Sequence, residues 1–172
     1  AAVNHAYNNR RIRFVPPLKH KSRAAVTPVR TYRLTLSNLG EMLDYTMTGS
    51  SRYAGHGTLL LPLRRYLIGA ICTLARPDAV LDMSTAAERG QWMKNDRRFN
   101  LNPSGRTQTK KHRPIVPVND LLHAWLCATD EWLVCKERSR FDADEQMERV
   151  EQIGVKAVRS GWDTMRARLG IP

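Results

Sequence analysis

The sequence is poor in the residues and patterns that build several classes of site. Its three cysteines, Cys72, Cys127 and Cys135, are odd in number and have no ligand-like spacing, so we expect reduced thiols and no zinc site. No apolar run approaches the roughly eighteen residues of a membrane span, and the basic start has no apolar signal-peptide core. No Walker A, Gly-x-Gly-x-x-Gly or Gly-x-Ser-x-Gly pattern occurs. We therefore expect a soluble, cytoplasmic protein with no cofactor and no metal.

The net charge of +12 is concentrated in two segments of the chain, where acidic residues are scarce. Residues 1–40 hold eight Lys or Arg and no acid, and residues 89–119 hold eight against Asp96 alone. The intervals 41–88 and 120–172 are slightly acidic. Concentrated positive charge suits a polyanion-binding surface, because each neutralised phosphate releases counterions. The charge pattern favours nucleic-acid binding over a basic face kept only for solubility.

Apolar periodicity predicts one mainly helical domain of 172 residues. The strongest helix runs from about Thr58 to Leu74, and its broad apolar surface belongs in a core. The other predicted helices are one capped by Thr35 or Ser37 and ending near Gly49, one of residues 78–83, one capped by Asn119, and one of about residues 155–169 that stops at Gly170.

Between Gly90 and Val118 the pattern changes to short polar strands. Candidate strands are Gln91–Lys94, Arg98–Leu101, Arg106–Thr109 and Arg113–Val118, the last two pairing as a hairpin around Lys110, Lys111 and His112. Trp132–Cys135 is a further short candidate, and the acidic stretch Phe141–Glu151 is interpreted as solvated. The predicted fold class is α+β, helical with a small antiparallel three-stranded sheet or hairpin at one edge.

Arg76 stands where the apolar helix must end, because Pro77 is poorly compatible with its continuation. A turn at this point is rigid enough to aim a guanidinium. If Arg76 has only a structural role, we expect it to form a salt bridge with Asp78 or Asp82. If the lysines of the hairpin have no functional role, they protect a strand edge against aggregation.

Five segments, in order along the chain, resemble the tyrosine recombinases of the phage integrase family. They are Asn4-His5-Ala6 with the proline-broken basic stretch after it, Arg33-Leu34-Thr35-Leu36, the apolar helix ending in Ala75-Arg76-Pro77, Thr109 to Val118 with its lysines and Val116-Pro117, and Ser160-Gly161-Trp162 to Pro172. The resemblance implies the end of a core-binding domain over 1–12, a basic linker over 13–33, and the N-terminal portion of a catalytic domain over 34–172. The chain has Ala79 where family members often carry an acid, with Asp78 one place earlier.

The resemblance also implies an activity and its residues. Arg76 matches the first catalytic arginine and Lys110 the catalytic lysine, with Lys111 as the alternative. The implied DNA-binding residues are Lys19, Lys21, Arg23, Arg106, Lys111 and Arg113. Such enzymes cleave and rejoin duplex DNA at an attachment site through a 3′-phosphotyrosyl intermediate and assemble as tetramers on DNA. They are bacterial or phage-encoded and act at the nucleoid.

The other half of such a site does not follow in the sequence, which has no His-x-x-Arg segment after Arg76 and no tyrosine after Tyr66. We expect these groups to lie beyond Pro172, so that the chain binds DNA weakly and does not cleave it. Two other function classes stay open: a non-catalytic basic module that binds DNA or RNA, and a structural or ribosome-associated protein that prefers RNA.

Overall fold

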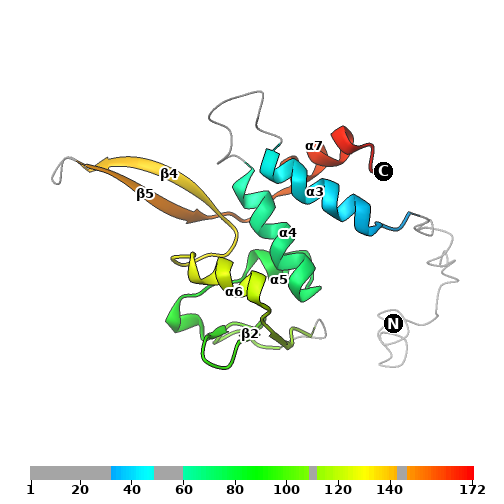
Figure 1. The fold of residues 1–172 in the computed structure, drawn as a ribbon. Coiled ribbons are helices and arrows are strands. Elements are labelled where there is room, and N and C mark those ends of the chain that lie inside the picture. The colour runs from blue at the N-terminus through cyan, green and yellow to red at the C-terminus, as the bar shows by residue number, and fades with distance from the viewer. Residues whose placement is uncertain (1–31, 49–59, 109–111, 143–146) are drawn as a thin grey trace, which may run out of the picture. The chain divides into compact units, whose positions relative to one another are not determined.

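The computed structural model describes residues 32–48, 60–108, 112–142 and 147–172. The chain divides between Arg33 and Leu34. The unit that follows, residues 34–172, is mixed α+β, with a three-stranded antiparallel sheet and a separate two-stranded ribbon in its described part (Figure 1). The predicted fold class is confirmed at this level.

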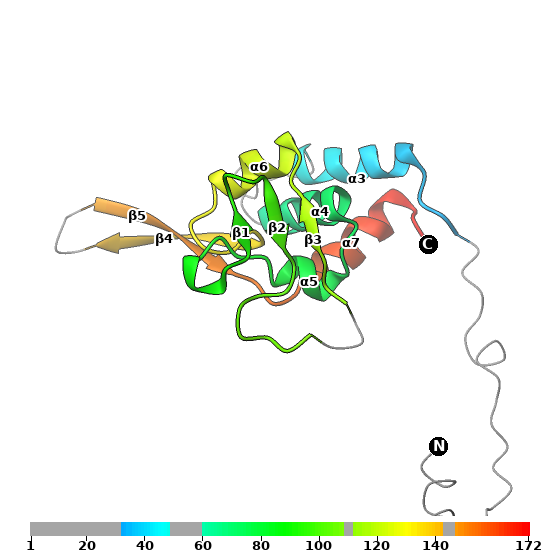
Figure 2. The same cartoon turned by 90° about the horizontal axis from the view of Figure 1, so that it is seen from below.

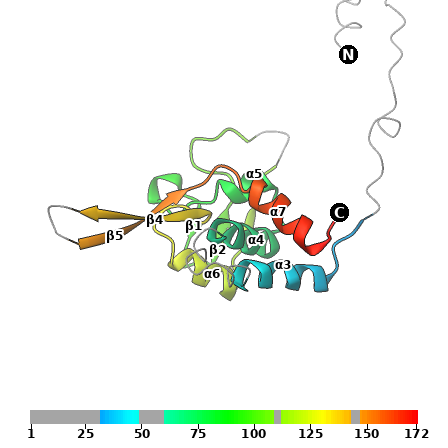
Figure 3. The same ribbon diagram turned by 90° about the horizontal axis from the view of Figure 1, so that it is seen from above.

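Three helices form one side of the unit: α3 (Leu36–Thr48), α4 (Leu61–Thr73) and α7 (Arg159–Leu169). Thr35 begins α3 as expected, because its hydroxyl accepts from the Asn38 N–H at 3.2 Å. Gly170 ends α7 in the left-handed conformation that glycine adopts without cost. α7 lies beside α3 and α4 (Figure 3), and the three enclose a small apolar core of Met42, Leu63, Leu67, Met165 and Ile171.

The larger core lies where α4 meets α5 (Pro77–Leu81), α6 (Asp120–Cys127) and the sheet. Asn119 caps α6 as predicted, since its side-chain oxygen accepts from the Leu122 N–H at 2.9 Å. Phe99, Leu122, Leu126 and Leu133 are fully buried in this core. α4 therefore has a buried surface on both sides, as its broad apolar composition predicts.

The sheet has the order β1 (Trp92–Met93), β2 (Arg98–Asn100) and β3 (Ile115–Pro117), as Figure 2 shows, preceded by a short 3-10 turn η1 (Ala87–Arg89). β3 pairs with β2, placing Phe99 opposite Val116. The predicted pairing of Arg106–Thr109 with Arg113–Val118 is wrong, since residues 106–108 form no strand. Arg106–Thr109 contains no apolar side chain to bury, whereas β2 contributes the buried Phe99.

The two-stranded ribbon consists of β4 (Cys135–Asp142) and β5 (Met147–Gly154). Its strands pair antiparallel over their full length, from Cys135 opposite Gly154 to Asp142 opposite Met147. The stretch 141–151, interpreted from the sequence as solvated, contributes residues to both strands, and its Val150 and Glu151 are exposed. The predicted strand Trp132–Cys135 supplies only the first residue of β4, because Leu133 and Val134 are buried in the core before the strand begins.

Arg65 of α4 is a buried cation at the root of the ribbon, with only 3% of its surface exposed. Its guanidinium donates to the Thr129 hydroxyl at 2.8 Å and to the Leu133 carbonyl at 3.5 Å. It also lies 5.3 Å from the centre of the Trp125 ring, a cation–π contact. These contacts connect α4 to the end of α6 and to the chain that enters β4.

Candidate functional site

The turn after α4 has a defined backbone that leaves the Arg76 side chain exposed. Leu74 adopts a left-handed conformation (φ 51°, ψ 25°) and donates its N–H to the Ala70 carbonyl at 2.8 Å. The Thr73 hydroxyl donates to the Gly69 carbonyl and accepts from the Ala75 N–H. Each of these bonds satisfies a backbone group at the end of the helix. The chain therefore reaches Arg76 through a fixed turn.

Arg76 itself occupies the N-cap position of α5, with an extended backbone (φ −66°, ψ 151°). Its carbonyl accepts from the Ala79 and Val80 N–H groups at 2.9 and 3.1 Å, and Pro77 takes the first helical position, where no N–H is needed. Within the described ranges, no hydrogen-bond or ion-pair partner holds the Arg76 guanidinium. The backbone of Arg76 is thus fixed while its charged end faces solvent.

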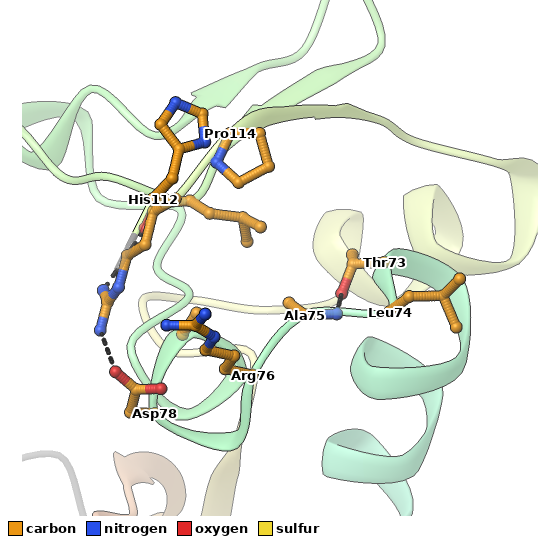
Figure 4. A pocket seen from close by; sticks show the side chains of 10 residues that line it. Thr73, Leu74, Ala75, Arg76, Asp78, His112 and Pro114 are labelled. Carbon is orange, nitrogen blue, oxygen red and sulfur yellow. Dashed lines mark hydrogen bonds and ion pairs between the residues drawn. The ribbon is translucent and has the colours of Figure 1, made fainter. Parts of the chain in front are cut away.

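A pocket of about 160 Å³ opens beside Arg76 (Figure 4). Three segments line it: the end of α4 with the turn and α5, the residue after β2, and the segment before β3. The lining residues are Thr73, Leu74, Ala75, Arg76, Asp78, Ala79, Leu101, His112, Arg113 and Pro114. The pocket thus joins the two segments that the sequence singles out, the Arg76 turn and the end of the lysine-bearing loop.

Arg113, whose own side chain is buried, connects these two segments through two ion pairs. Its guanidinium donates to Asp82 Oδ2 at 2.5 Å and to Asp78 Oδ2 at 3.0 Å, and its side chain is 8% exposed. Burial lowers the pKa of Arg113, but hydrogen bonds and the charges of Asp82 and Asp78 outweigh it, so that the pKa lies above the ordinary value. Arg113 is therefore a permanent cation that binds the segment before β3 to α5.

Asp82 is shared with a second arginine. Arg89 Nη2 donates to Asp82 Oδ1 at 2.5 Å, and Arg89 Nε donates to Gln91 Oε1 at 3.1 Å. The Arg89 guanidinium also lies 4.7 Å from the centre of the Trp132 ring. Each Asp82 oxygen thus has an arginine partner. The network fixes the C-terminal end of α5 against η1 and against the segment before β3.

A second cavity, of about 580 Å³, shares Asp78 and Arg113 with the first. Its other walls are Leu81 and Asp82, Trp132, and the end of the ribbon with the residues after it: Ile153, Gly154, Val155 and Lys156. The Asp78–Arg113 ion pair therefore forms part of the wall of both cavities, and Asp82 lines the second.

The predicted site residues have different surroundings. Lys19, Lys21, Arg23, Lys110 and Lys111 lie outside the described residues. Arg106 is half-buried, and its carbonyl accepts from the Asn102 side chain at 3.0 Å. A direct DNA contact would require an exposed Arg113 side chain, but this side chain is buried and held in its ion pairs.

His112 lines the pocket and is exposed, although the sequence predicts only a turn at this position. Its place directly after Lys110 and Lys111 is the feature of the sequence that could have indicated a functional role. Asp78 and Asp82 were expected as alternative partners of Arg76, but both bind Arg113. The structure thus leaves Arg76 available to an anion and assigns the two carboxylates a structural contact.

The chemistry of the pocket suits an oxyanion. An arginine fork can give two parallel, charge-assisted hydrogen bonds to a phosphate or carboxylate. In the described segments, no group of three or more His, Cys, Asp or Glu side chains is placed to hold a metal ion. The pocket can therefore bind and orient an anion with Arg76 as its main cation.

Among the described helices, none is long and apolar enough to cross a membrane. Comparison with protein-family models, with curated proteins and with solved structures finds no match to this chain.

Proposed function

We propose that the Arg76 pocket binds a phosphate of duplex DNA, and that residues 34–172 are the arginine- and lysine-bearing portion of a tyrosine recombinase. The proposal rests on one observation: the Arg76 turn and His112 line the same pocket, and His112 directly follows the two lysines in sequence. The surplus of positive charge in residues 1–40 and 89–119 supports a polyanionic partner.

In this proposal Arg76 binds the non-bridging oxygens of the scissile phosphate. The transition state of phosphoryl transfer gains charge on these oxygens, and a planar guanidinium can bind two of them with directional hydrogen bonds. Lys110, or Lys111 in its place, protonates the leaving oxygen as its bond breaks. Neither step uses a cofactor.

The attacking tyrosine is not supplied by the pocket, since no tyrosine is among its lining residues in the described part of the chain. The proposed enzyme cleaves and rejoins DNA through a 3′-phosphotyrosyl link as a tetramer on an attachment site in the bacterial cytoplasm. The 172-residue chain alone binds duplex DNA weakly and forms no covalent adduct.

The rival function is a non-catalytic basic module that binds DNA or RNA, in which Arg76 stabilises the fold through a salt bridge. The exposed Arg76 guanidinium, which has no partner in the described segments, favours the recombinase proposal, because a structural arginine would use its hydrogen bonds as Arg113 does.

A competition experiment separates the two functions. Labelled duplex DNA bound to the chain is challenged with unlabelled duplex DNA or duplex RNA of the same sequence, using the wild type and Arg76→Lys. The proposal expects DNA to compete better than RNA, and Arg76→Lys to bind DNA more weakly because lysine keeps the charge but lacks the planar fork. Equal competition by RNA, together with unchanged binding by Arg76→Lys, would identify the general basic module.

A further inference from the structure

The ribbon of β4 and β5 extends away from the helices and the sheet in all three views (Figures 1, 2 and 3). Its base is packed: Cys135 is fully buried, and Gly154 lies against the Trp132 ring. Farther along, Lys136, Arg138, Ser139, Val150 and Glu151 are all exposed.

Such a ribbon has little conformational stability of its own. An isolated two-stranded antiparallel pair is only marginally stable in water, because it has no face packed on a core. Val150 nevertheless projects from it with 60% of its surface exposed. A ribbon of eight-residue strands without a covering layer is therefore expected to have a partner.

The register separates the charges of the ribbon onto its two faces. Residues directly opposite one another share a face, and successive residues alternate between faces. Among the residues whose side chains the structure describes, Lys136 and Arg138 fall on one face, opposite Ile153 and Glu151. The other face carries Glu137, opposite Gln152, and no base among the described side chains. One described face is thus net positive by one charge (two bases less one acid), and the other is net negative by one.

Lys136 and Arg138 are both exposed and lie two residues apart on the same face. The charge separation indicates a polyanion on this face.

We propose that the β4–β5 ribbon is a second DNA-contacting element, which seats its basic face in the major groove of the duplex. The inference rests on the proposed function, because the partner is the same duplex DNA. The major groove admits a two-stranded β-ribbon, and its guanine edges and flanking phosphates accept hydrogen bonds from arginine and lysine. Strands of eight residues extend over about 27 Å at 3.4 Å per residue, or roughly eight base pairs.

The test compares two double variants that each remove two exposed positive charges. Lys136→Gln with Arg138→Gln alters the ribbon, and Arg159→Gln with Arg168→Gln alters α7 by the same amount of charge. Affinity for a labelled duplex is measured over a series of salt concentrations, after melting curves show that both proteins fold. Each lost phosphate contact lowers the slope of log affinity against log salt by about 0.9. The proposal expects the ribbon variant to lose affinity and up to two such steps of slope, and the α7 variant to lose less than one.

Arg76→Ala in the same assay separates the two proposals. If Arg76→Ala weakens binding and the ribbon variant behaves like the α7 variant, the ribbon proposal is overturned and the pocket proposal stands. If only the ribbon variant weakens binding, the ribbon contacts DNA and the pocket proposal fails. A ribbon variant that weakens binding to duplex RNA more than to duplex DNA, or that alters only self-association, also overturns the ribbon proposal.

Discussion

Arg113 Nη1 donates to Asp82 Oδ2 at 2.5 Å, and this bond joins the segment before β3 to the end of α5. The same guanidinium reaches Asp78 at the start of α5, which lies two residues after Arg76. The ion pair therefore sets where the segment before β3, which follows the two lysines in sequence, lies relative to the Arg76 turn. The shape of the pocket depends on a lining arginine whose guanidinium is bound to two carboxylates.

Replacement of Arg113 by methionine is predicted to destabilise the unit by about 2–3 kcal/mol, the range for hydrogen bonds between charged groups that lose a buried partner. Methionine keeps much of the apolar volume but leaves the Asp82 and Asp78 carboxylates without their shared cation. Urea unfolding followed by circular dichroism measures the change.

The matched control is Arg97→Met. Arg97 forms an ion pair with Asp120, but both side chains are well exposed, at 49% and 92%, so solvent screening should leave stability almost unchanged. Equal effects of the two substitutions would contradict the structural role assigned to Arg113.

Gly154→Ala is predicted to destabilise the base of the ribbon. A Cβ at this position would lie 2.6 Å from Trp132 Cγ, and overpacking of this kind costs about 1–3 kcal/mol. Gly40→Ala is the control, because Gly40 lies within α3 and a Cβ there meets nothing within 4 Å. Alanine at position 40 should stabilise the helix by about 1 kcal/mol. Thermal melts of both proteins should therefore shift in opposite directions.

Leu74→Gly is predicted to increase stability by about 0.5 kcal/mol, because glycine removes the cost of a left-handed leucine but gains flexibility in the unfolded chain. The Leu74 side chain is 89% exposed, so little packing is lost. Leu74→Ala keeps a Cβ and the strain, and should leave stability nearly unchanged. A lower unfolding midpoint for Leu74→Gly than for Leu74→Ala would show that the leucine makes a contact absent from this account.

The cysteines should differ sharply in reactivity. Burial raises the pKa of the Cys135 thiol above its ordinary value of 9.0, with Arg65 opposing the shift and Glu137 and Asp130 adding to it. Cys127 is exposed. An alkylating reagent at neutral pH should therefore modify Cys127 in the folded protein and spare Cys135 until urea is added, as mass spectrometry of the peptides would show.

The raised pKa of Cys135 also has a consequence for stability at high pH. In the unfolded chain the thiol ionises at its ordinary pKa, while the folded state holds it neutral to higher pH. The contribution of the neutral thiol is thus complete below the ordinary pKa and is lost as the pH rises through the folded value. Cys135→Ala should flatten the decline of the melting temperature at alkaline pH, and an unchanged decline would show that the thiol does not contribute.

Local signals explain what the sequence could predict. The end of α4 before Pro77, the Asn119 cap and the Gly170 stop each depend on residues within one turn of the helix end. The position of Arg76 between two helices follows from the same signals. Leu74 is the exception: it was expected on the apolar stripe of the helix, but the left-handed turn directs its side chain to solvent.

Non-local pairing explains what the sequence could not predict. β3 pairs with β2 across a long loop, and Arg113 reaches Asp82, 31 residues away in sequence, so no short-range pattern marks either contact. The sequence did not predict the ribbon because its strands lack the apolar alternation that marks a half-buried strand. Its charged composition is typical of a solvated segment.

The affinity of the 172-residue chain for duplex DNA, compared between wild type, Arg76→Ala and the exposed α7 control Arg159→Ala, tests the central claim most directly. The account predicts that Arg76→Ala melts like the wild type but binds about tenfold more weakly, the loss expected for one charged hydrogen-bonding partner, whereas Arg159→Ala binds nearly as well as the wild type. Equal affinity of the two variants, or unfolding of Arg76→Ala, would contradict the claim that Arg76 is held free to bind a DNA phosphate.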